Sequence, residues 1–91
     1  MCTYQTETLV LEGSAKGPEG WRPVSTATVY YDHPNSLAAL HSLNIDFLDL
    51  DVGAAPRVAA VELDAASARE LAHAILRTLD MVDNGARRHE S

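Results

Sequence analysis

The chain has 91 residues and a formal net charge of -6, from 13 Asp and Glu against 7 Lys and Arg. A chain this short forms one domain, and it holds no apolar run near the ~20 residues that a membrane-spanning helix needs. Its acidic balance argues against nucleic-acid binding, which ordinarily needs a basic patch. A single cysteine and an N-terminus without a secretory signal pattern predict a reducing, cytoplasmic location.

The first two-thirds of the chain predict four strands. Alternating and β-branched residues indicate strands over 3–12 and 24–31, joined by a Gly-rich loop over 13–20. The clearest strand spans 41–48, where apolar residues alternate with polar ones, and a fourth spans 57–63. A period of two means that one face of the sheet is apolar and the other polar.

A helix is predicted directly after the fourth strand. Asp64 is a suitable N-cap, and apolar residues recur at steps of three and four as far as Val82. Gly85 is expected to end the helix, which leaves 86–91 as a flexible polar tail. The sequence therefore predicts one α+β domain over 1–85, a four-stranded antiparallel sheet of order β-β-β-β-α with the helix packed on one face.

The face of the sheet turned away from the helix is expected to be bare. It would carry Tyr30, Asn44, Asp46 and Glu62, which are candidates for a small-molecule site or for a contact between subunits. A four-stranded sheet with one bare face often pairs with a second copy, so we expect a homodimer.

One group of residues predicts a metal-binding or catalytic site. His33 and His41 flank the loop between the second and third strands symmetrically, so an antiparallel pair places them opposite each other, with Cβ atoms roughly 4.5–5.5 Å apart. If Tyr4 faces Tyr31 in the first pair of strands, Cys2 joins the two histidines in one row.

A thiolate and two imidazoles suit zinc, copper or iron, so Cys2, His33 and His41 are candidate metal ligands. Asp32 or Glu7 is a candidate supporting group or further ligand. Three alternatives stand beside this reading. The histidines pair by hydrogen bonding without a metal, Cys2 is a thiolate nucleophile beside an imidazole, or the protein is an interaction module without chemistry.

Several strings are distinctive together: MCTYQTE at the start, GPEGW in the first loop, then VYYDHP and LNIDF. Over residues 1–80 they resemble a family of short, uncharacterised actinobacterial proteins that is described as a domain of unknown function, and the resemblance implies no activity. In the family pattern a histidine often follows DHP by one residue, and an acid often precedes the residue matching His41. This chain has Ser36 and Leu40 at those positions, which leaves the cysteine and the two histidines as the ligand set.

Overall fold

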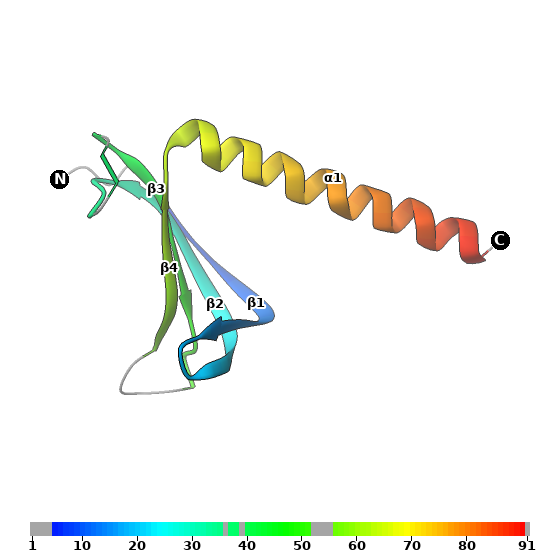
Figure 1. The fold of residues 1–91 in the computed structure, drawn as a ribbon, viewed down its shortest axis with the longest axis horizontal. Coiled ribbons are helices and arrows are strands. Elements are labelled where there is room, and N and C mark those ends of the chain that lie inside the picture. The colour runs from blue at the N-terminus through cyan, green and yellow to red at the C-terminus, as the bar shows by residue number, and fades with distance from the viewer. Residues whose placement is uncertain (1–4, 36, 39, 52–55, 91) are drawn as a thin grey trace.

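The computed structural model describes residues 5–35, 37–38, 40–51 and 56–90, with side chains as far as residue 84. Its elements are β1 (Thr6–Gly17), β2 (Gly20–Asp32), β3 (Ser42–Leu48), β4 (Arg57–Leu63) and α1 (Ala65–Glu90). The strands form one antiparallel sheet in the order β1-β2-β3-β4, and the helix follows it (Figure 1). The predicted fold class is confirmed. Within the described residues, no helix combines the length and apolar character needed to cross a membrane.

The hairpin of β1 and β2 is longer than the sequence predicts. Gly17 pairs with Gly20, so most of the stretch 13–20 continues the two strands instead of forming a loop. Gly20 has a φ of 109°, a left-handed backbone conformation that favours glycine at a tight turn. The register also shifts between Val10 and Gly13, which marks a bulge that bends β1. The glycines that suggested a loop therefore serve a turn and a bulge.

The register of the strands separates the odd-numbered and even-numbered side chains onto two faces. Ile45 lies opposite Val29 on one side and Val61 on the other. The side chains of this face, which we call the apolar face, are Leu9, Ala27, Val29, Tyr31, Leu43, Ile45, Phe47, Ala59, Val61 and Leu63. The opposite face, which we call the polar face, carries Thr26, Thr28, Tyr30, Asn44, Asp46 and Glu62.

The start of α1 agrees with the sequence prediction. The Ser67 N–H donates to the Asp64 carboxylate at 2.7 Å, and the Ala68 N–H donates to the Asp64 carbonyl at 2.9 Å, so Asp64 is the N-cap. Hydrogen bonds from the Ser67 hydroxyl and N–H hold the pKa of Asp64 below its ordinary value. The helix continues to Glu90, past Gly85 where the sequence predicts its end. A glycine in helical conformation costs only about 1 kcal/mol relative to alanine, which is too little to end a helix by itself.

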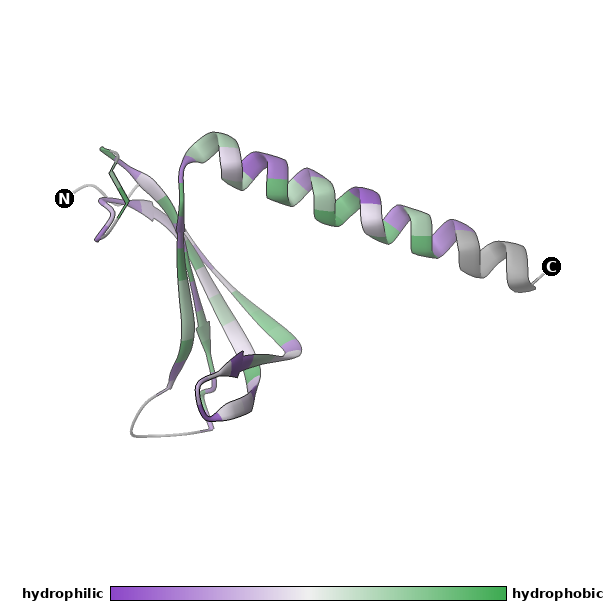
Figure 2. Ribbon diagram, in the orientation of Figure 1, coloured by the Kyte–Doolittle hydropathy of each residue, from purple (hydrophilic) through white to green (hydrophobic). Residues whose placement is uncertain are grey.

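Most of α1 extends beyond the sheet. It begins beside the apolar face and then projects away from it (Figure 1), with its greener, hydrophobic side turned toward the sheet (Figure 2). Side chains on that side are about half exposed, among them Leu71 at 46%, Ile75 at 51% and Leu79 at 53%. The radius of gyration is 15.9 Å, against about 12 Å for a compact chain of this length. The core is correspondingly thin, since among the described residues the buried apolar side chains are Val24 and Ala27.

Candidate functional site

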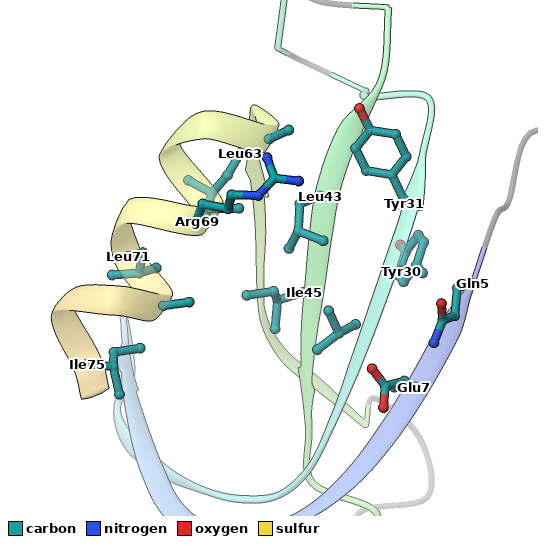
Figure 3. A pocket seen from close by; sticks show the side chains of 14 residues that line it. Gln5, Glu7, Tyr30, Tyr31, Leu43, Ile45, Leu63, Arg69, Leu71 and Ile75 are labelled. Atoms are coloured by element: carbon teal, nitrogen blue, oxygen red, sulfur yellow. The ribbon is translucent and has the colours of Figure 1, made fainter. Parts of the chain in front are cut away.

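An open groove lies between the apolar face of the sheet and the first turns of α1 (Figure 3). Its volume is about 760 Å³, and we call it the helix–sheet groove. The apolar side chains that line it are Val29, Leu43, Ile45 and Leu63 from the sheet and Ala65, Ala68, Leu71, Ala72 and Ile75 from the helix. Polar groups in its lining come from Gln5, which precedes β1, from Glu7 on β1 and from Arg69 on α1. The lining of the groove is mostly apolar, so it accepts apolar side chains readily.

His33 and His41 lie side by side, as the hairpin symmetry predicts. Their ring centroids are 5.1 Å apart with an interplanar angle of 20°, and His41 also stacks on Tyr31 at 5.6 Å. Nδ1 of His33 lies 3.0 Å from the carbonyl oxygen of Leu40. Because a carbonyl only accepts, Nδ1 carries the hydrogen and the lone pair resides on Nε2. Histidines that ligate metals show this arrangement, with one ring nitrogen donating to a carbonyl or carboxylate.

The other residues predicted to join the histidines are placed differently. Asp32 ends β2, and its Oδ1 accepts the backbone N–H of His33 at 2.7 Å. Glu7 lies opposite Val29, four positions along β2 from His33, and lines the helix–sheet groove. Cys2 lies outside the described residues, so its place beside the histidines stays a prediction. The described part of β1 pairs with β2 one residue out of the assumed register, and no group of three or more His, Cys, Asp or Glu gathers among the described residues.

A second hollow lies on the polar face, where the segment after β2 meets β3 and β4. Its volume is about 540 Å³, and we call it the polar pocket. Its lining residues are Tyr30, Asn35, Leu37, Asn44, Asp46, Arg57, Ala60, Val61 and Glu62. The carboxylate of Glu62 holds the segment in place, because it accepts the backbone N–H of Asn35 and, at 3.3 Å, that of Leu37. The face that the sequence predicts to be bare is therefore partly covered.

A tyrosine and an ion pair meet in the polar pocket. The Tyr30 hydroxyl donates to Asp46 Oδ2 at 3.2 Å, and Nη2 of Arg57 lies 3.7 Å from the same oxygen. Burial raises the pKa of Tyr30, and the negative charge of Asp46 raises it further. The phenol therefore stays protonated through neutral pH and donates to the carboxylate.

Two polar side chains of β3 are buried together, and one of them, Asn44, lines this pocket. Ser42 is fully buried and Asn44 is 6% exposed. The Ser42 hydroxyl donates to Asn44 Oδ1 at 2.6 Å. Within the described residues, the amide nitrogen of Asn44 has no hydrogen-bond partner, although Asn44 lines the pocket.

The structure thus brings together two of the predicted sets of residues. His33 and His41 stack at the loop, while Tyr30, Asn44, Asp46 and Glu62 line one pocket. Sequence reasoning missed the covering segment, because Asn35 and Leu37 contribute backbone N–H groups that leave no signal in residue type. It also missed Arg57, whose proximity to Asp46 depends on the register between β3 and β4.

Comparison with known proteins places the chain in a family without assigning an activity. A family model described as a family of unknown function, DUF6295, matches residues 1–88. No curated protein and no solved structure matches the chain.

Proposed function

The chain belongs to the DUF6295 family, whose function is unknown, and we propose that it works as a homodimeric interaction module. The observation that carries the proposal is the apolar stripe of α1, which remains exposed beside an open apolar groove. We define the helix stripe as Ala68, Leu71, Ala72, Ile75, Leu76, Leu79 and Val82. Large contiguous apolar surfaces of this kind mark interaction sites in proteins that stay in solution.

The exposed area supports a second copy as the occupant. The chain exposes 7095 Å², whereas a compact monomer of 9.8 kDa is expected to expose about 5,200 Å². If each of two copies buried the difference of about 1,900 Å², the interface would total about 3,800 Å². That value falls within the range of obligate homodimers, about 2,000–5,000 Å².

The shape of the groove supports an exchange of helices. A helix is about 10 Å wide with its side chains, and the groove is open rather than enclosed. Beyond its first turns, α1 leaves the sheet (Figure 1). If the α1 of each copy enters the groove of the other, both stripes and both apolar faces become buried around one two-fold axis. The polar face is less suited to self-association, since Asp46 and Glu62 would each meet like charges near that axis.

The association state tests this proposal. Wild-type protein is expected to have twice the mass of one 9.8 kDa chain by light scattering, and Ile75→Glu is expected to give the single-chain mass. His73→Glu is the matched control, because it places the same carboxylate on the opposite side of α1, and it should leave the dimer intact. A wild-type monomer at all accessible concentrations, or equal effects of the two variants, would overturn the proposal. Circular dichroism confirms that both variants keep the sheet.

We propose metal binding at the histidine pair as a second candidate function. The observation that favours it is the stacked pair of His33 and His41, in which Nδ1 of His33 lies 3.0 Å from the Leu40 carbonyl oxygen, the arrangement that metal-ligating histidines show. The two imidazoles suit zinc, copper or iron, and Cys2 is the third ligand that the sequence predicts.

Cobalt(II) is the probe for this second candidate, because its visible spectrum reports the ligands. Wild-type protein is expected to bind one cobalt ion per chain, and His33→Ala combined with His41→Ala is expected to abolish binding. His73→Ala on the helix is the control and should bind normally. A thiolate charge-transfer band that disappears in Cys2→Ser would assign the cysteine as a ligand. Binding that survives the double histidine variant would refute the site.

A further inference from the structure

We propose that the polar pocket binds a small neutral molecule that presents a carbonyl oxygen next to an N–H group, as the edge of an amide, a ureide or a nucleobase does. The site is distinct from the helix–sheet groove, because most of the two linings come from opposite faces of the sheet and Tyr30 is the one residue that they share. The proposal therefore goes beyond dimerisation and does not depend on it.

The donor in this site is the side-chain amide of Asn44. Asn44 is 6% exposed, and its Oδ1 is already occupied by the Ser42 hydroxyl at 2.6 Å. That hydrogen bond fixes the orientation of the amide and directs its NH₂ group away from Ser42. No buried side-chain nitrogen or oxygen of the described residues lacks a hydrogen-bond partner, so this NH₂ group reaches solvent through the pocket that Asn44 lines. A ligand that accepts a hydrogen bond there takes the place of water.

The acceptor in this site is Oδ1 of Asp46. Both Tyr30 and Arg57 approach the other carboxylate oxygen, Oδ2, and Oδ1 has no hydrogen-bond partner among the described residues. The side chain is 16% exposed and lines the polar pocket. Tyr30 and Arg57 hold the carboxylate in one orientation, which prepares Oδ1 to accept from a ligand.

The spacing of these two groups selects the ligand class. Asn44 and Asp46 are two residues apart on one face of β3, so their Cβ atoms lie about 7 Å apart. A ligand fits this spacing if its carbonyl oxygen accepts from the Asn44 amide and the N–H on the neighbouring atom donates to Asp46, each at about 2.9 Å. A donor beside an acceptor on the protein therefore matches an acceptor beside a donor on the ligand.

The rest of the pocket favours a neutral and partly flat molecule. Two carboxylates, Asp46 and Glu62, and one guanidinium, that of Arg57, line it, and this negative balance disfavours an anionic ligand. Leu37 and Ala60 supply apolar surface against which the body of the ligand can pack.

Uracil is a suitable probe, because its ring edge carries carbonyl and N–H groups on neighbouring atoms. In proton–nitrogen correlation spectra of the labelled protein, uracil is expected to shift the side-chain NH₂ signals of Asn44 with a Kd in the millimolar range, as befits a small fragment. Dimethyluracil, in which both ring N–H groups are methylated, is the matched control ligand and is expected to bind at least tenfold more weakly.

Variants make the test independent of any single spectrum. Asp46→Asn replaces the acceptor with a mixed donor and acceptor and should weaken uracil binding at least tenfold, while Asp80→Asn on α1 should leave it unchanged. Equal binding of uracil and dimethyluracil, or uracil shifts confined to the helix–sheet groove, would overturn the proposal. Unchanged affinity in Asp46→Asn, with the fold verified by its spectrum, would overturn it as well.

Discussion

The two faces of the sheet differ in a way that runs against the usual order of burial. The polar face holds the most deeply buried side chain, Ser42, and beside it Asn44 at 6% exposed. The apolar face adjoins a helix whose stripe is half exposed, and Leu9 at its β1 end is 46% exposed. Globular proteins normally bury apolar surface first, because that burial supplies most of the folding free energy.

The comparison teaches that the two faces reach their stability in different ways. The polar face is partly covered within one chain, since Glu62 holds the segment after β2 and Tyr30 donates to Asp46. One chain does not cover its own apolar face, because α1 leaves the sheet after its first turns (Figure 1). The α1 of a second copy would cover the rest of the apolar face, so we expect the dimer to form through this face.

The largest expected effect comes from a charge placed on the apolar face. Leu9→Asp should raise the dimer Kd about tenfold or more, since burying a leucine side chain contributes about 1.5–3 kcal/mol. Thr8→Asp is the matched control, because the neighbouring side chain lies on the polar side of the same strand and is also exposed. Sedimentation equilibrium measures both constants. Equal constants for the two variants would mean that the interface does not extend over β1.

A moderate effect is expected from loosening the cover of the polar face. Glu62→Gln replaces a charged acceptor of two backbone N–H groups with a neutral one, which should lower the free energy of unfolding by about 1–2 kcal/mol. Urea denaturation at fixed protein concentration measures this change, and Glu70→Gln on the exposed side of α1 is the control. Hydrogen exchange at Asn35 and Leu37 should quicken at the same time. Unaltered exchange at those amides would show that Glu62 does not hold the segment.

The smallest expected effect is a dependence of stability on alkaline pH. The folded-state pKa of Tyr30 is raised above the ordinary value of 10.0, so above that value the unfolded chain loses the phenol proton before the folded chain does. The phenol therefore contributes stability that is present below pH 10 and is lost as pH rises through the folded pKa. In Tyr30→Phe this alkaline loss should be smaller than in the wild type. Urea denaturation between about pH 8 and about pH 11 measures the free energy of unfolding of both proteins. An equal loss of stability in the wild type and in Tyr30→Phe would contradict the raised pKa of Tyr30.

Local rules accounted for much of the fold and for some of the residues that meet at the two candidate sites. The alternation along β3 predicted its two faces, Asp64 predicted the start of α1, and hairpin symmetry predicted that His33 meets His41. The loop expected over 13–20 was wrong, because glycine permits a bulge or a tight turn as readily as a loop. Gly85 was likewise wrong as the end of α1.

By itself the sequence determined which residues are strand or helix and which side chains share a face, since both follow from periods of two and of three to four residues along the chain. The tertiary structure alone decided what each face meets. The direction in which α1 leaves β4 keeps the helix stripe exposed, and the path of the segment after β2 brings the backbone of Asn35 and Leu37 onto Glu62. These outcomes depend on contacts between residues distant in the chain, which local periodicity does not encode.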